Sequence, residues 1–375
     1  MLALLLALAP LPLVEGYAPP KTLLQEPLPS LTLRLPQVVR ATYLGNGHIE
    51  VGYVLLQVAP GETSPARLLR LAQEGVRGAL EARAGLAEVD LAIYPAPYSG
   101  PQDLPLFTAS IPKSQVPEFL SQGNPSSYGR LWFNPGFRQE KALEPVLEDR
   151  PRYEGPEAYW AKEKAEQILS SRVGYRGGVL YHGNPGRPYV ALTFDDAPHP
   201  LFTPLLLDLL RREGIRATFF VIGRNAEAYP YFVRDLVAAG YELGNHTYHH
   251  LRLPGLEPGE IRRELLLCNQ VLEHLTGAPP RYFRPPGGRY DRNVLQVARD
   301  LGLTTVFWTD DPGDYAGLPL PLLEKRLEAH LRPGGIVLLH DNVVNTLRVL
   351  PIFIQKARAQ GLTLGTVGGL VLGQR

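Results

Sequence analysis

The feature that most constrains the fold is an alternation of short apolar runs with helix-like segments that begins at Gly177. The runs have the length of buried strands, and amphipathic segments such as residues 203–213 and 226–239 lie between them. Strand and helix in alternation predict an α/β fold with a parallel sheet and helices outside it. Seven such units favour a closed or nearly closed barrel. The predicted strands are residues 190–194, 217–222, 241–244, 282–284, 304–308, 335–339 and 362–367.

Polar and ionisable side chains follow most of these predicted strands, and two adjacent acids, Asp195 and Asp196, follow the first. Two carboxylates at the end of an apolar strand are costly to bury unless something binds them. Catalytic residues of such barrels gather at the C-terminal ends of the strands. The residues that follow the third to sixth predicted strands are Asn245, His246, His249 and His250; Arg284; Thr309, Asp310, Asp311, Asp314 and Tyr315; and His340 and Asp341.

The spacing of two histidines favours a metal site. His246 and His250 are four residues apart, and on one helical turn both imidazoles would point the same way. With Asp196 they would make a three-ligand site with open positions, suited to zinc, cobalt or another divalent first-row metal. A lone pair of this kind can also be two surface histidines. The carboxylates at another strand end favour metal binding, and His249 is expected to be solvated or to support the ligands.

The N-terminal part has a different organisation. Residues 1–16 resemble the apolar region of a signal peptide without its basic start, and an ordinary apolar segment is the alternative. A Pro-rich linker (17–36) precedes a predicted small α+β domain (37–135), which has a hairpin around Asn46 and a helix starting at Pro65 with Ser64 as its cap. We expect this domain to serve in packing or docking. A helical segment (136–176) would connect it to the second domain (177–375).

Composition narrows the classes of partner. The 375 residues carry a formal net charge of +1, so neither nucleic acid nor an anionic membrane is favoured as a partner. The apolar N-terminal run is too short for a helix that spans a bilayer. The single cysteine, Cys268, excludes an intrachain disulfide and is expected to be a buried apolar residue. We expect a monomer.

Five short motifs resemble those of the polysaccharide deacetylases, the NodB-homology group of carbohydrate esterase family 4. The resemblance covers residues 177–372, with the motifs in family order, and implies a distorted (β/α)7 barrel. The motifs are Thr193-Phe-Asp-Asp-Ala-Pro198, His246-Thr-Tyr-His-His250, Arg284-Pro-Pro-Gly287, Asp311-Pro-Gly-Asp314-Tyr315 and Leu338-Leu-His340-Asp341.

The resemblance also implies a role for each motif residue. A divalent metal would polarise the acetamide carbonyl and lower the pKa of a bound water. The expected ligands of this metal are Asp196, His246 and His250. Zinc is favoured, with cobalt and nickel as alternatives.

The other motif residues would carry out the proton transfers and hold the substrate. Asp195 would be the general base, and Arg284 would keep it ionised and oriented. His340 would be the general acid, with Asp314 favouring its charged form. The backbone N–H of Gly287 would stabilise the oxyanion, Leu338 would line the pocket for the acetyl methyl group, and Tyr315 would lie near the sugar.

Two aspartates keep ordinary structural interpretations, because Asp311 fits a turn residue and Asp341 a helix cap. Three positions depart from the family pattern. Ala197 replaces a glycine, which matters if that residue needs a positive φ. Gly287 and Tyr315 stand where the family has aromatic residues, a Trp in the second case, which puts sugar stacking and substrate choice in question.

These features predict a hydrolase that removes N-acetyl groups from an amino-sugar polymer, peptidoglycan or a chitin-like chain, outside the cytoplasm. One alternative is an O-acetyl esterase acting on xylan-type polysaccharide. Another is a non-catalytic wall-binding protein that keeps the barrel; the presence of the base, the acid and all three ligands disfavours it.

Overall fold

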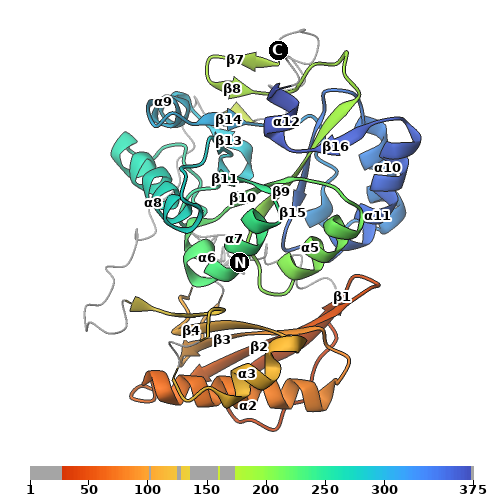
Figure 1. Ribbon diagram of the computed structural model, residues 1–375. Helices are drawn as coiled ribbons and strands as arrows, with labels where there is room; N and C mark the ends of the chain where they lie inside the picture. The colour runs from red at the N-terminus through yellow and green to blue at the C-terminus, as the bar shows by residue number, and fades with distance from the viewer. Residues whose placement is uncertain (1–27, 101–102, 125–127, 136–158, 161–173, 373–375) are drawn as a thin grey trace, which may run out of the picture.

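The computed structural model describes residues 28–100, 103–124, 128–135, 159–160 and 174–372, which form two main sheets with their helices and one short two-stranded sheet (Figure 1). The predicted signal peptide (1–16) lies outside the described residues, as do most of the predicted linker (17–36) and of the connecting segment (136–176). Within the described part of the chain, no helix is long and apolar enough to cross a membrane.

The smaller sheet has the strand order β1-β2-β3-β4-β5, with β2 and β3 parallel and the other pairs antiparallel. The turn between β1 and β2 is held by Asn46, whose Oδ1 accepts hydrogen bonds from the backbone N–H groups of His48 and Ile49. The elements of this part are β1 (Val38–Gly45), β2 (Glu50–Val58), α2 (Pro65–Ala82), β3 (Glu88–Pro95), β4 (Phe107–Pro112), α3 (Val116–Ser121) and β5 (Leu131–Phe133).

Helix α2 starts at Pro65, as predicted from the fixed φ of proline, which suits the first helical position. The predicted cap is confirmed in its position but not in its hydrogen bond. Ser64 occupies the N-cap position, but its side chain makes no capping hydrogen bond. The helix is therefore held by its buried side, which includes Leu68, Leu71 and Val76, packed on one face of the sheet.

The larger sheet follows the order β15-β9-β10-β11-β12-β14-β8-β7, with β16 also paired to β9. All of these pairs are parallel except β7 with β8. Each of the seven strands predicted after Gly177 falls on one of these strands. Their bounds are β7 (Tyr175–Arg176), β8 (Val179–Leu180), β9 (Tyr189–Ala197), β10 (Thr218–Val221), β11 (Glu242–Asn245), β12 (Tyr282–Phe283), β14 (Thr304–Val306), β15 (Ile336–His340) and β16 (Thr363–Gly365).

The sheet curls, and helices cover its outside (Figure 1). Beyond the end of β14, Asp310 forms a parallel bridge with Val337 of β15, which brings the two sides of the sheet together. A two-stranded pair, β6 (Tyr159–Trp160) with β13 (Arg289–Tyr290), lies apart from this sheet. The helices are α5 (Thr203–Arg212), α6 (Gly223–Ala228), α7 (Pro230–Ala238), α8 (Pro258–Thr276), α9 (Arg292–Asp300), α10 (Leu320–His330), α11 (Val344–Ala359) and α12 (Val367–Leu372).

The helix predicted over residues 226–239 is wrong as a single element, because two helices, α6 and α7, meet at Tyr229 and Pro230. A residue before proline is pushed out of the helical region by the proline ring. Tyr229 accordingly has φ −129° and ψ 55°, and the chain turns there.

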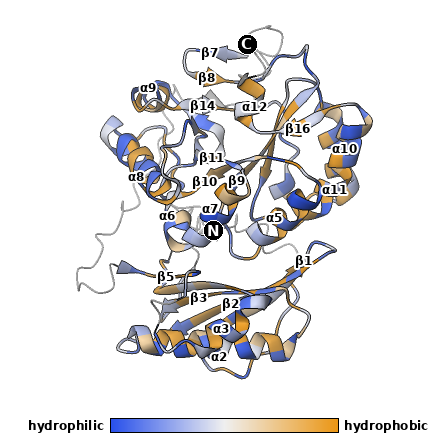
Figure 2. Cartoon of the chain, in the orientation of Figure 1, coloured by the Kyte–Doolittle hydropathy of each residue, from blue (hydrophilic) through white to orange (hydrophobic). Residues whose placement is uncertain are grey.

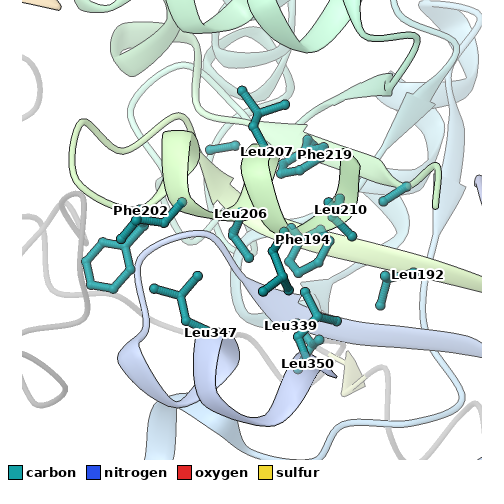
Figure 3. Packing of buried hydrophobic residues seen from close by; sticks show 14 of the residues in the cluster. Leu192, Phe194, Phe202, Leu206, Leu207, Leu210, Phe219, Leu339, Leu347 and Leu350 are labelled. Carbon is teal, nitrogen blue, oxygen red and sulfur yellow. The ribbon is translucent and has the colours of Figure 1, made fainter. Parts of the chain in front are cut away.

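The central core forms where α5 packs against the sheet. Leu206 and Leu210 of α5 pack with apolar side chains of β9, β10 and β15, and Leu347 and Leu350 of the neighbouring helix α11 join the same cluster (Figure 3). Orange strands inside and bluer helix surfaces outside show the same division in hydropathy (Figure 2). Cys268 is fully buried in this cluster, as predicted.

Candidate metal centre and active site

The predicted site residues converge because four strands of the curled sheet end at the same edge. In the parallel register His340 of β15 lies beside Asp195 of β9, and Asn245 of β11 lies beside both Val221 and Phe283. The residues that directly follow β11 and β12 are therefore neighbours of the two acids. This register brings the predicted motifs that follow β9, β11, β12 and β15 to one edge of the sheet.

Three buried side chains offer ligand atoms to one point. Asp196 Oδ1 lies 3.2 Å from His250 Nε2 and 3.5 Å from His246 Nε2. One ligand atom from each residue lies within 4.8 Å of the others. Two imidazole nitrogens and a carboxylate oxygen are a ligand set that zinc and similar divalent ions accept.

The hydrogen bonds of these residues fit a metal. His246 Nδ1 lies 2.8 Å from the carbonyl oxygen of Arg284, which can only accept, so Nδ1 carries a proton and Nε2, which faces Asp196, is the nitrogen that would bind a metal. Asp196 Oδ1 is buried and has no hydrogen-bond partner. Burial opposes ionisation of Asp196, but His250, His246 and His340 outweigh it and hold its pKa below the ordinary value. A bound cation would satisfy this orphaned carboxylate oxygen.

The two candidate histidine ligands do not lie on a helical turn, which corrects the reasoning from spacing. The positive φ values among the described non-glycine residues belong to Asp196 (69°), Thr247 (65°) and His250 (59°). Left-handed backbone is costly for such residues, above all for β-branched threonine, and tends to occur at functional sites. These turns aim the two imidazoles at Asp196. Ala197 keeps a negative φ, so its methyl group is accommodated where the family has glycine.

Asp195 is held by a buried arginine. Arg284 Nη1 lies 2.7 Å from Asp195 Oδ1 and 2.8 Å from Thr193 Oγ1, and Arg284 Nε donates to the Val306 carbonyl oxygen. Arg284 is fully buried, which lowers its pKa from the ordinary value, and its guanidinium lies 4.1 Å from the centre of the Phe220 ring. The ion pair keeps the carboxylate of Asp195 in a fixed orientation beside the metal ligands.

His340 is paired with Asp314 on the other side of the site. Asp314 Oδ1 lies 2.9 Å from His340 Nδ1, and its Oδ2 accepts from the His340 backbone N–H and from Thr346 Oγ1. Burial disfavours the charged imidazole, but Asp314, followed by Asp196 and Asp195, raises the pKa of His340 to about 10. The imidazolium form is thus available to donate a proton at neutral pH.

The remaining predicted residues lie around this centre. Gly287 is exposed and has φ 63°, a conformation that favours glycine over the aromatic residue of the family pattern. Tyr315 is 38% exposed and meets His340 edge-on, with ring centroids 5.2 Å apart. Leu338 is buried on β15 next to Thr193. Asp311 accepts from the Gly313 N–H, the turn role predicted for it.

Two supporting residues were not predicted correctly. Asp341 does not cap the following helix. Its carboxylate accepts a hydrogen bond from Thr203 Oγ1 at the start of α5, and its backbone N–H donates to the Asp195 carbonyl oxygen. Asn342, which sequence reasoning missed, donates from Nδ2 to Asp196 Oδ2 at 3.0 Å. The only sequence signal for Asn342 was its position directly after the His340-Asp341 motif.

His249 supports the site from the side. Its Nδ1 lies 2.7 Å from Glu264 Oε1, and its backbone N–H donates to Glu264 Oε2. Glu264 belongs to α8 and is buried. These two contacts anchor the loop that carries His246 and His250 to that helix.

Comparison with known proteins leads to the same family as the sequence motifs. A family model described as polysaccharide deacetylase matches residues 182–306. A chitooligosaccharide deacetylase of Sinorhizobium fredii is 39% identical over 157 residues, which cover 42% of this chain and 73% of that relative. A peptidoglycan-N-acetylglucosamine deacetylase of Bacillus cereus is 34% identical over 161 residues, 43% of this chain and 58% of that relative. The chain thus spans less than two thirds of the length of the Bacillus protein.

A solved structure of a carbohydrate esterase family 4 pseudoenzyme from Bacillus anthracis superposes with a TM-score of 0.50 at 32% identity, over 52% of this chain and 69% of that one. A mutant of that pseudoenzyme with restored enzymatic activity matches with the same TM-score at 33% identity, over 52% and 72% of the two chains. The shared fold therefore occurs with and without activity, and function has to be argued from the site residues.

Proposed function

Because the chain belongs to the polysaccharide deacetylase family, whose members hydrolyse N-acetyl amide bonds, we propose that it is a metal-dependent deacetylase of an amino-sugar polymer, peptidoglycan or a chitin-like chain. One observation carries this proposal. The buried Asp196, His246 and His250 present ligand atoms to one point, with a buried base candidate and an acid candidate on either side.

Each residue of the site has a different role in the proposed reaction. When bound to Asp196, His246 and His250, a divalent ion supplies Lewis-acid polarisation of the acetamide carbonyl. Asp195, oriented by Arg284, accepts the proton of the attacking water. His340, whose protonated form is stabilised by Asp314, donates a proton to the amine nitrogen as the C–N bond breaks. Acetate and a free amino sugar are the products.

Three further residues would contact the substrate. The N–H of Gly287 would donate to the oxyanion; Pro286 has no such N–H group. Leu338 would face the acetyl methyl group. Tyr315, exposed beside His340, would offer a smaller ring than the family's tryptophan to the sugar. Loss of aromatic surface at positions 287 and 315 would weaken sugar stacking and leave the metal chemistry intact.

We further propose the finer features that the sequence predicted. The curled sheet would be a distorted (β/α)7 barrel, which the pairing of β16 with β9 and the bridge from Asp310 to Val337 support. Residues 37–135 would form the small α+β domain and 177–375 the catalytic one, with a common hydrophobic core between them. The metal would be zinc, with cobalt or nickel as alternatives, and the protein a monomer outside the cytoplasm, where peptidoglycan lies.

Acetate release from matched substrates tests this function. The purified protein with added zinc or cobalt should release acetate from chitooligosaccharides or peptidoglycan faster than from O-acetylated xylan. Faster release from xylan would identify an O-acetyl esterase. No release from any of the three would support a non-catalytic protein, as in the Bacillus anthracis pseudoenzyme. An Asp195→Asn variant measures the background in each assay.

A further inference from the structure

The small β1–β5 sheet falls outside the family match at residues 182–306, and its sequence predicts only a role in packing or docking. It packs on α5, α6 and α7, the helices that follow β9 and β10 (Figure 1). These helices begin at the C-terminal ends of their strands, which is the edge that carries the metal ligands. The small sheet contacts His199 in the connection that leaves this edge after β9, so part of it lies near the active-site end of the larger sheet.

The first contact reaches the segment that carries both acids. Tyr53 of β2 meets His199 edge-on with ring centroids 6.3 Å apart, and Phe202 also meets this imidazole edge-on, at 4.9 Å. Both Tyr53 and His199 are buried. His199 lies three residues after Asp196, in the connection between β9 and α5.

This connection is tied to the site by further hydrogen bonds. The His199 backbone N–H donates to Thr203 Oγ1 at 2.8 Å, and Thr203 Oγ1 donates to the Asp341 carboxylate. The Asp341 N–H donates to the Asp195 carbonyl oxygen at 2.8 Å. A continuous set of contacts thus runs from Tyr53 to the backbone of the two acids.

The second contact reaches the loop of the two histidines through α6. The backbone N–H groups of Gly223 and Arg224, at the start of α6, donate to the carbonyl oxygens of Thr247 and Tyr248. At the other end of α6 the Ala228 carbonyl oxygen accepts a hydrogen bond from Thr108 Oγ1 of β4. Helix α6 is therefore held between the small sheet and the metal-binding loop.

Both loops need such support, because they carry the left-handed residues Asp196, Thr247 and His250. Unfavourable backbone of this kind persists only where surrounding structure determines it. We propose that the small sheet is a positioning element of the metal centre, with Tyr53 acting through His199 and Thr108 acting through Ala228. This inference rests on the proposed metal site and assigns no catalytic step to the small sheet.

Metal binding by full-length variants tests the proposal without substrate. Tyr53→Ala and Thr108→Val should each weaken zinc affinity, measured by competition with a chromophoric chelator. Loss of a group bonded directly to a metal ligand typically lowers affinity by about 10- to 100-fold, and since Tyr53 and Thr108 act one step further away, we expect a measurable loss below that range. Both variants should also change the visible absorption bands of bound Co²⁺, which report ligand geometry. Thr108→Val keeps its size and shape, so it remains informative if Tyr53→Ala does not fold.

Leu56→Ala is the matched control. Leu56 is a fully buried neighbour on β2 that faces α2 and belongs to the core on the far side of the sheet. It should lose stability while keeping the wild-type zinc affinity and cobalt spectrum. The proposal would be overturned if both Tyr53→Ala and Thr108→Val kept the wild-type zinc affinity and cobalt spectrum. It would also be overturned if Leu56→Ala lost as much zinc affinity as these two variants. If the wild-type protein itself bound no zinc or cobalt, the proposed function would fail instead.

Discussion

At the scale of single residues, two adjacent acids acquire different roles from different partners. Asp195 faces the guanidinium of Arg284, whereas Asp196 faces the imidazoles of His246 and His250. The spacing of the two histidines and the adjacent acids predicted the partners of Asp196, whereas Arg284 as the partner of Asp195 followed from the family resemblance. The positive φ of Asp196 could not be predicted, because aspartate adopts it only where the surrounding fold imposes it.

Substitution of each acid should separate their roles. Asp195→Asn should lower kcat for acetate release by about 10²- to 10⁴-fold, the usual contribution of a general base. It should keep zinc affinity near the wild-type value, whereas Asp196→Asn should lose zinc binding. Chelator competition and initial rates on the same preparations provide both measurements. Equal loss of zinc in the two variants would make Asp195 a ligand and contradict the division.

The pairing of His340 with Asp314 predicts a pH dependence. The folded-state pKa of His340, about 10, exceeds the ordinary histidine value of about 6.5. The pair therefore stabilises the fold fully below pH 6.5 and loses this contribution as pH rises through about 10.

Asp314→Asn removes the carboxylate and should lower the pKa of His340. The alkaline limb of the kcat profile, where His340 loses its proton, should then move to lower pH. Rates across the alkaline range for both proteins test this expectation. If the alkaline limb stayed at the same pH in the variant, His340 could not be a general acid whose protonated form depends on Asp314.

At the scale of elements, apolar runs and proline positions predicted where strands and helices lie. Each of the seven strands predicted after Gly177 corresponds to a strand of the structure, whereas the two-residue strands β8 and β13 are too short to give a pattern and were not predicted. The break at Pro230 was not predicted either, because the apolar pattern continues across it. The histidine loop was mistaken for a helical turn, since a spacing of four residues does not distinguish a helix from a loop with positive φ values.

Helix α5 should depend on its buried side. Leu210 is fully buried between α5 and the sheet, so Leu210→Ala should lower the free energy of unfolding by about 2–5 kcal/mol. Arg212→Ala, on the exposed side of the same helix, removes an ion pair with Asp208 and should change stability little. Urea denaturation of the two variants compares them. Similar losses in both would mean that α5 is not held by the apolar contacts of Figure 3.

At the scale of the whole molecule, the sequence indicated two parts but not how they meet. The hydrophobic cluster that includes Phe194 and Leu206 also contains Val51, Tyr53 and Tyr94 from the small sheet. Arg130 adds a polar link, with ion pairs to Glu88 of its own sheet and to Asp235 of α7. Contacts between residues so distant in sequence leave no periodic pattern, which is why they could not be predicted.

A shared core should make the two parts unfold together. Calorimetry of the full chain should show one cooperative transition for both sheets, because exposing the common cluster destabilises each of them. Near-ultraviolet circular dichroism should follow the same midpoint. Two transitions separated by several degrees would show that the small sheet and the larger sheet are independently stable.

Metal titration of chelator-treated protein is the most direct test of a metal-dependent deacetylase. Acetate release from N-acetylglucosamine oligomers should be absent without metal and should rise with added zinc to a plateau at one equivalent per chain. The same titration should raise the melting temperature, since an ion that binds only the folded protein stabilises it. Acetate release that persists at the full rate in the metal-free protein would contradict the assignment of Asp196, His246 and His250 as an essential metal centre.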